Sequence, residues 1–202
     1  MSRPICPTCQ RPTKVCLCDF IEHIDNRVEV GILQHPSEVG LVKGTAKIAQ
    51  LSLSYCHTWC GEDLQDLPDL VEWLGDDKPV FLLYPVIEGQ HEPVKFYEVT
   101  QIRHLHAHEE IKLLILDGTW RKTHKIMMLN SVLRGMDRIS LKPCTPSAYR
   151  IRKQKSATSL STIEAVYEAL SQLEDDYLRY QPLLKTFESM QQQQAVFTKR
   201  PK

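Results

Sequence analysis

One stretch decides the fold of this 202-residue chain: Ile111-Lys112-Leu113-Leu114-Ile115-Leu116-Asp117-Gly118-Thr119-Trp120. Its first part, residues 111–116, is a nearly continuous apolar run, which is typical of a β-strand covered on both faces. Residues 80–84 repeat the pattern between two prolines. The two runs predict a buried, parallel sheet, and the polar residues 117–120 then form a loop where one of its strands ends.

Strand-like and helix-like segments alternate on either side of this stretch. Further strands are predicted at residues 28–33 and 138–141, and helices at residues 45–55, 119–133 and 177–190. Ser161-Thr162-Ile163-Glu164 opens what we expect to be the longest helix with a capping box, a hydroxyl followed three residues later by a carboxylate. The alternation predicts an α/β fold with a mostly parallel sheet and helices on both faces.

Composition places the chain among ordinary globular proteins, with 42% apolar and 25% charged residues. No apolar run approaches the roughly 20 residues that span a bilayer, and the first residues lack the apolar core of a signal peptide. We therefore expect a cytoplasmic protein, without membrane association and monomeric. Its seven cysteines should be reduced thiols or metal ligands. Residues 1–27 are expected to form a small appendage and residues 28–202 the main domain.

The net charge of zero hides a strong asymmetry along the chain. Residues 119–155 contain ten Lys or Arg residues and a single acid, Asp137. Scattered charges usually form no more than a solvated face. A dense basic block beside an unusual loop favours a surface that binds a polyanion, and an overall pI near 7 does not oppose this because binding depends on the local field.

The appendage carries four closely spaced cysteines: Cys6, Cys9, Cys16 and Cys18. One tight turn can aim the first pair at a single ion, and the segment has too little apolar material for a core. The pattern favours a tetrahedral zinc knuckle, in which the metal supplies the folding energy. A redox pair would not need the second pair of thiols. An iron–sulfur cluster uses the same ligands and stays open as an alternative.

Three loops leave the predicted strands with unusual residues. They are Leu83-Tyr84-Pro85, the loop of residues 117–120, and residues 156–164, which run into a helix N-terminus. Taken singly, Asp117 and Thr119 would be read as helix caps and Trp120 as a packing residue. In an open α/β sheet, however, ligands bind beyond the carboxyl ends of the strands, so all three loops should meet at one edge beside the basic block. This coincidence favours a binding site.

Taken together, these motifs resemble the DTW-domain family, which is named for an Asp-x-Thr-Trp loop. The resemblance covers almost the whole chain and has no departure at the matching positions. It rests on the following residues: Arg3-Pro4, Cys6, Cys9, Arg11-Pro12, Cys16, Cys18, Leu33 to Glu38, Thr45-Ala46, Leu83-Tyr84-Pro85, Asp117 to Trp120, Tyr149 to Lys153, and Leu160 to Ala165.

The resemblance implies a tRNA-uridine aminocarboxypropyltransferase. Such an enzyme moves the 3-amino-3-carboxypropyl group of S-adenosylmethionine onto N3 of a uridine, in the bacterial branch the variable-loop uridine at tRNA position 47, and releases methylthioadenosine. It also implies a SPOUT-like sheet with a trefoil knot, a rare feature that no sequence pattern reveals. Two alternatives stay open: a SPOUT-class RNA methyltransferase, and a zinc-stabilised RNA-binding module without catalysis.

Roles for the loop residues follow from the resemblance and the chemistry. Asp117 is the candidate general base for the uridine N3 proton. Trp120 would stack on a base or attract the sulfonium. The cofactor pocket is expected to comprise Leu83, Tyr84, Pro85, Asp117, Gly118, Thr119, Trp120, Leu160, Ser161 and Thr162. Phosphate contacts are expected from Arg121, Lys122, Arg150, Arg152 and Lys153. The metal ligands are expected to be Cys6, Cys9, Cys16 and Cys18, with Zn²⁺ as the ion.

Overall fold

The computed structural model describes residues 4–41, 44–85, 94–106, 110–141 and 160–198. Its centre is a six-stranded sheet in the order β2-β1-β5-β3-β6-β4, and every pairing between these strands is parallel. The strands are β1 (Glu29–Gln34), β2 (Cys56–Cys60), β3 (Val80–Leu83), β4 (Phe96–Glu98), β5 (Lys112–Asp117) and β6 (Arg138–Ser140). The predicted α/β class is therefore confirmed.

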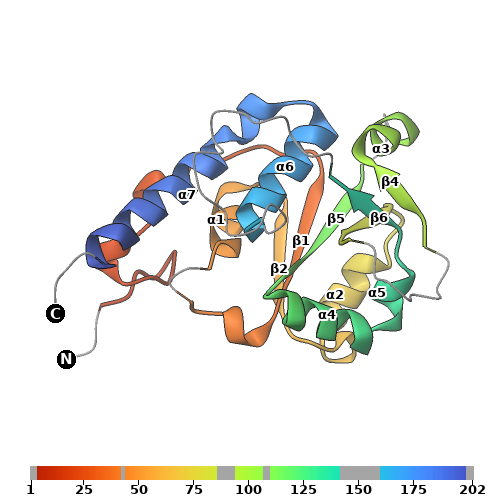
Figure 1. The fold of residues 1–202 in the computed structure, drawn as a ribbon, viewed down its shortest axis with the longest axis horizontal. Helices are drawn as coiled ribbons and strands as arrows, with labels where there is room; N and C mark the ends of the chain where they lie inside the picture. The colour runs from red at the N-terminus through yellow and green to blue at the C-terminus, as the bar shows by residue number, and fades with distance from the viewer. Residues whose placement is uncertain (1–3, 42–43, 86–93, 107–109, 142–159, 199–202) are drawn as a thin grey trace.

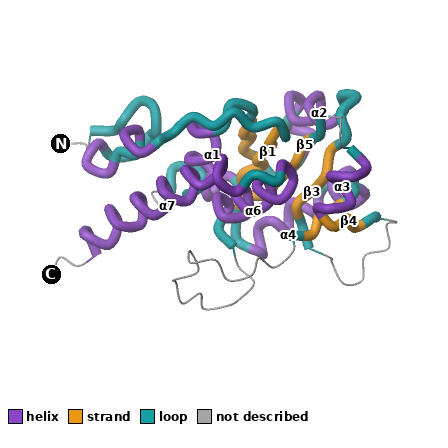
Figure 2. Tube along the Cα trace, turned by 90° about the horizontal axis from the view of Figure 1, so that it is seen from above, coloured by secondary structure: helices purple, strands orange, loops and turns teal. Residues whose placement is uncertain are grey.

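Helices cover both faces of the sheet (Figures 1 and 2). The helices are α1 (Ala46–Ser52), α2 (Pro68–Leu74), α3 (Val99–Leu105), α4 (Trp120–Leu129), α5 (Ser131–Gly135), α6 (Thr162–Glu174) and α7 (Tyr177–Thr198). Residues of α1, α3, α6 and α7 join one hydrophobic core cluster, and residues of α2, α4 and α5 join the other. Within β5, Leu113 and Ile115 face the first cluster while Leu114 and Leu116 face the second, so the apolar run fills both cores.

Lys112 is the one charged residue in the apolar run of β5, and it is fully buried. Its ammonium group donates to the Trp73 carbonyl oxygen at 2.5 Å and pairs with the Asp76 carboxylate. It also lies 4.7 Å from the centre of the Trp73 ring. Because a buried charge is tolerated only when it is paired and hydrogen-bonded, these contacts explain how a lysine fits an interior strand.

The helical region predicted over residues 119–133 is two helices instead of one. The break is at Asn130, whose backbone is extended with φ −114° and ψ 104°. Its side-chain oxygen accepts from the Leu64 N–H at 2.8 Å, and its amide donates to the carbonyls of Glu62 and Ile126 at 2.8 and 2.7 Å. These tertiary hydrogen bonds hold Asn130 out of the helix, and no helical periodicity in the sequence reveals them.

The C-terminal helix α7 is longer than expected. It has 22 residues, whereas α6, which was predicted to be the longest helix, has 13. It runs beside the N-terminal segment (Figure 1), and three of its side chains donate to backbone carbonyls there. Arg179 bonds to Asp25, Thr186 to Phe20 and Gln193 to Cys16, at 3.2, 2.6 and 3.0 Å. The donors are seven residues apart, which places them on one side of the helix. This contact extends α7 beyond the predicted end at residue 190.

Two further points concern the expectations for the fold. The predicted start of α6 is confirmed, since the N–H and hydroxyl of Ser161 both bond to the Glu164 carboxylate, at 2.8 and 2.6 Å. The trefoil knot stays a prediction, because residues 142–159, which connect β6 to α6, lie outside the described residues. In the part of the chain that the structure describes, no helix has both the length and the apolar character to cross a membrane.

Gly31, in the middle of β1, is required by close packing. A Cβ atom added there would lie 2.7 Å from a ring carbon of Trp73. We expect Gly31→Ala to lower the free energy of unfolding by about 1–3 kcal/mol, because an extra methyl group in a packed core forces neighbours to move. Urea unfolding measures this change.

Gly135→Ala is the matched control, because a Cβ added at this α5 residue meets no atom within 4 Å. It should leave stability unchanged or raise it by less than about 1 kcal/mol. Equal losses for the two variants would contradict the packing explanation.

Candidate active site and metal centre

The Asp117 carboxylate ends β5 and connects three segments of the chain. It is only 8% exposed. Its Oδ2 accepts a hydrogen bond of 2.6 Å from Nε2 of Gln34, the residue opposite it at the end of β1. Its Oδ1 accepts from the hydroxyl of Thr162, the first residue of α6. The sequence predicted that these loops meet at one edge, and the structure brings two of them together on this carboxylate.

Gly118 allows the two central strands to stay close beyond their last pair. The His35 N–H bonds to the Asp117 carbonyl at 2.9 Å, so the backbones of β1 and β5 are still in contact there. A Cβ atom on Gly118 would lie 3.3 Å from Cβ of Lys122 and 3.4 Å from Cβ of His35. A larger residue would therefore push the start of α4 away from β1.

Tyr84 and Trp120 form an aromatic wall next to this carboxylate. Their rings stack with 5.4 Å between centres and 14° between planes. Tyr84, which follows β3, is buried, and burial raises the pKa of its phenol. Trp120 is 58% exposed, although a tryptophan with only a packing role would usually be covered. The indole therefore combines a fixed position with an accessible apolar surface, which is what a stacking ligand needs.

The hydroxyl groups predicted to meet a ligand differ in their surroundings. Thr119 precedes α4, but its side chain makes no capping hydrogen bond, and the residue is exposed. Ser161 and Thr162 are half-buried and already donate to Glu164 and Asp117. Leu160 is exposed beside them. Of the three hydroxyl residues, only Thr119 is exposed on the surface of the site.

The basic residues at this edge are partly neutralised. Lys122 pairs with Glu38 at 2.6 Å, and Lys125 pairs with Glu62. Glu62 also lies 2.5 Å from Nε2 of His35, and Lys125 and His35 lower the pKa of its carboxyl group. Arg121 is exposed on α4. The other predicted phosphate contacts, Arg150, Arg152 and Lys153, lie outside the described residues.

Gln34, His35, Glu38 and Glu62 were not assigned side-chain roles from the sequence. The sequence indicates residues 33–38 only as part of the family resemblance. Its contact with Asp117 and α4 depends on the strand order, which places β1 directly beside β5.

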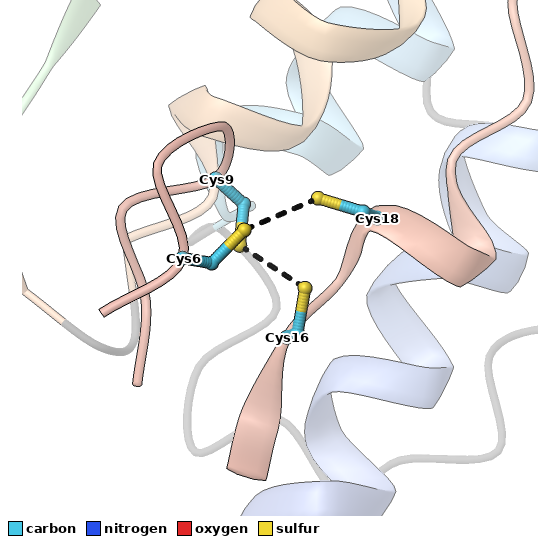
Figure 3. Close-up of side chains that lie close together, drawn as sticks. All are labelled: Cys6, Cys9, Cys16 and Cys18. Atoms are coloured by element: carbon cyan, nitrogen blue, oxygen red, sulfur yellow. Dashed lines mark hydrogen bonds between the residues drawn. The ribbon is translucent and has the colours of Figure 1, made fainter. Parts of the chain in front are cut away.

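Cys6, Cys9, Cys16 and Cys18 come together in the N-terminal segment (Figure 3). All four sulfur atoms lie within 4.8 Å of one another, with 3.6 Å between Cys6 and Cys18 and 3.7 Å between Cys9 and Cys16. Four thiolates about 2.3 Å from a tetrahedral zinc ion would be about 3.8 Å apart. The spacing thus fits a single ion, whereas an iron–sulfur cluster distributes its four cysteines over two or more iron atoms and needs some of them further apart.

The local backbone prepares these thiols for a cation. N–H groups of Cys9 and Thr8 lower the pKa of the Cys6 thiol to about 6, which favours the thiolate that metals bind. Gln10 has the left-handed φ of 58°, and its N–H bonds to the Cys6 carbonyl at 2.9 Å, which closes the turn between the first two cysteines. Within the described residues this is the one group of three or more potential ligands, so Cys56 and Cys60 form no second site there.

The chain is similar to known proteins over most of its length. Residues 3–195 match the DTW domain. A protein of Macaca fascicularis named tRNA-uridine aminocarboxypropyltransferase 2 is 30% identical over 202 residues, which cover 93% of this chain and 62% of that protein. The protein of that name from Drosophila melanogaster is 31% identical over 176 residues, 84% of this chain and 66% of its own.

A shorter match involves tRNA-uridine aminocarboxypropyltransferase 1 of Homo sapiens, which is 37% identical over 68 residues, 34% of this chain and 22% of its own. The chain spans less than two thirds of the length of each of these relatives. No solved structure matches it.

The hydrogen bond from Thr162 to Asp117 should be measurable as stability. We expect Thr162→Val, which keeps the shape but removes the hydroxyl, to lower the free energy of unfolding by about 1–2 kcal/mol, because it leaves a buried carboxylate with one donor fewer. Thr162→Ser keeps the hydroxyl and should lose less than half as much. Urea unfolding compares the two, and equal losses would contradict the prediction, because they would show that the methyl group contributes as much as the hydrogen bond.

Proposed function

Because the chain belongs to the DTW domain family, we propose that it is a tRNA-uridine aminocarboxypropyltransferase. It would transfer the 3-amino-3-carboxypropyl group of S-adenosylmethionine to N3 of a tRNA uridine, the variable-loop uridine at position 47, and release methylthioadenosine. The observation that carries the proposal is the meeting of a buried carboxylate, an exposed stacked indole and a helix N-terminus at one edge of a parallel sheet.

The reaction needs precise placement more than strong chemical assistance. Uridine N3 loses its proton and forms a bond to the methylene carbon next to the sulfonium. The carbon–sulfur bond breaks, and its electron pair stays on sulfur to give neutral methylthioadenosine. Since the sulfonium has three electrophilic carbons, the carbon that the pocket holds in line with N3 decides which group is transferred.

The aromatic wall supports this placement. The exposed face of Trp120 offers a stacking surface for adenine or for the target uracil, and Tyr84 holds the indole from behind. An indole also attracts a positively charged sulfonium. Backbone groups of Leu83, Tyr84 and Leu160 would hold the adenosine, with Pro85 and Gly118 lining the pocket.

Asp117 is the proposed acceptor of the N3 proton. Each carboxylate oxygen has two lone pairs, and each accepts one hydrogen bond from a residue within the chain. Counting the described residues, one further acceptor position per oxygen therefore remains for the substrate. Gln34 and Thr162 keep the carboxylate at a fixed angle, which a general base requires.

The carboxylate of the transferred group needs hydrogen-bond donors. Thr119 fits because its hydroxyl is exposed, whereas Ser161 and Thr162 would have to exchange their present partners. The N-terminus of the 13-residue helix α6 adds the positive end of a helix dipole.

The cysteine cluster is proposed to bind Zn²⁺ in a structural role. Cys6, Cys9, Cys16 and Cys18 supply all four positions of a tetrahedral ion, so no position would be open for a substrate. When bound, the ion would fix the turn between Cys6 and Cys9 relative to the segment that contacts α7.

The transfer itself can be tested directly. Purified protein is incubated with an unmodified tRNA transcript and S-adenosylmethionine labelled in the aminocarboxypropyl group, and the digested nucleosides are identified by mass. The proposal expects the label on a variable-loop uridine. Label found only when the methyl group is labelled would indicate a methyltransferase, and bound but unmodified tRNA would indicate a binding module.

Replacing the proposed base should separate chemistry from binding. We expect Asp117→Asn to lower kcat by about 10²–10⁴-fold while the Kd for S-adenosylmethionine changes little, since the amide keeps the shape but cannot take the proton. Single-turnover transfer and equilibrium cofactor binding measure the two quantities. Asp69→Asn, at an exposed position of α2, is the control and should leave both unchanged. Equal losses in kcat and affinity for Asp117→Asn would instead assign the carboxylate to binding.

The basic residues should bind the tRNA backbone. We expect charge reversal of Arg150 and Arg152 to weaken tRNA binding and to reduce its salt dependence, because each lost phosphate contact lowers the slope of log K against log salt by about one. Reversal of Lys47 and Lys185, on α1 and α7, changes the net charge equally and should have a smaller effect. Unchanged tRNA affinity in the Arg150 and Arg152 variant would exclude this segment from the RNA surface.

A further inference from the structure

Arg11 is a buried cation with no hydrogen-bond partner among the described residues. Only 6% of the residue is exposed. Nε and both terminal nitrogens of its guanidinium group are buried, and no acceptor in the described chain lies within hydrogen-bond distance of any of them. None of the described ion pairs includes Arg11. The arginines of the described ion pairs, Arg27, Arg103 and Arg179, all have side chains at least 37% exposed.

Such a side chain needs a counter-charge. A buried guanidinium without acceptors loses its hydration and gains nothing in return, which costs several kcal/mol in typical proteins. Burial lowers the pKa of Arg11, but an arginine does not release its proton in a folded protein. An anion must therefore be present nearby in the functional state.

The nearest source of negative charge is the cysteine cluster. The Arg11 guanidinium interacts electrostatically with the sulfurs of Cys9 and Cys16, the second and third members of the cluster. The backbone holds Arg11 there, because its carbonyl accepts the Cys6 N–H at 2.8 Å in the same closed turn. As neutral thiols, these sulfurs would be weak acceptors.

Metal binding changes this balance. A divalent ion bound by four thiolates leaves two negative charges in excess, spread over the sulfur atoms. These sulfur atoms are the acceptors that the guanidinium lacks. Groups that interact with the ligands of a metal, and not with the metal itself, tune the affinity of metal sites.

We propose that Arg11 is the internal counter-charge of the metal–thiolate centre, where it neutralises the excess charge on Cys9 and Cys16 and so strengthens metal binding. The inference rests on the proposed metal at this cluster. Arg11 is a positioning residue in this account, because its charge would act on the ligands and not on the metal. It also implies that the site has evolved for a tetrathiolate ion, since a neutral or cationic centre would repel a buried arginine.

Three single variants of the full chain test the proposal. Arg11→Met keeps most of the apolar stem and removes the charge, Arg11→Lys keeps the charge, and Lys14→Met removes a cation from an exposed position of the same segment. Zinc affinity is measured by competition with a chromophoric chelator. Absorption of the Co²⁺-loaded proteins reports whether all four thiolates still bind.

We expect Arg11→Met to weaken zinc binding by about 10–100-fold, the usual effect of losing a partner of the ligands. Arg11→Lys should recover at least half of this loss on a logarithmic scale, and Lys14→Met should bind as the unmodified chain does. The Co²⁺ spectrum of Arg11→Met should retain its thiolate charge-transfer bands, which shows a weakened but intact site.

Other outcomes would overturn the proposal. If Arg11→Met binds zinc as tightly as the unmodified chain, or if Lys14→Met loses as much, Arg11 has no special relation to the centre. If Arg11→Lys loses as much zinc affinity as Arg11→Met, the role of Arg11 depends on shape and not on charge. Where Arg11→Met folds poorly, the zinc affinity of Arg11→Lys relative to the unmodified chain still tests this. An unmodified chain that binds no zinc would overturn the zinc assignment together with the inference, whereas the other results leave that assignment intact.

Discussion

The parallel pairing of β5 with β1 along the whole of both strands is the constraint on which the rest of the structure depends. It puts Asp117 opposite Gln34 at the last position of the register. A parallel pair cannot be joined by a tight turn, so the chain must cross from one edge of the sheet to the other between paired strands. The helices of these crossovers cover both faces and explain why β5 is buried from its first residue to its last. Parallel pairing also brings the carboxyl ends of all six strands to one edge.

The site depends on this constraint in a specific way. A carboxylate with 8% exposure would be costly alone, and here a donor from β1 and another from the start of α6 compensate it. Both donors are placed by the sheet, one by strand register and one by the helix that packs over it. Trp120 follows at the start of α4 and stacks on Tyr84 after β3, so four elements meet within a few residues of Asp117. The proposed transfer reaction needs this type of rigid placement because orientation decides which carbon reacts.

The cysteine cluster has a different physical basis. Its turn has few apolar side chains of its own, and its contacts are hydrogen bonds to the side of α7 together with Leu17 and Ile24, which enter the main core. Without a cation, the negative charges of four thiolates less than 5 Å apart would be poorly compensated. The active-site edge is thus stabilised by burial and register, whereas the cluster is organised around charge. In the proposed metal site, the ion and the buried Arg11 would be two parts of one electrostatic balance.

Sequence patterns alone were enough to predict β1, β3, β5 and β6, the class of fold and the chemistry of single motifs, whereas they did not reveal β2 and β4. A nearly continuous apolar run such as residues 111–116 is typical of a strand covered on both faces. The Ser161–Glu164 capping box marks the start of its helix locally, and four cysteines in thirteen residues indicate a cluster that could hold a metal ion. Which distant residues meet depends on the tertiary structure. The pairing of Gln34 and Thr162 with Asp117, the helix break at Asn130 and the burial of Arg11 all depend on strand order and packing. Periodicity records which side of an element is buried, but it contains no information on which element covers it.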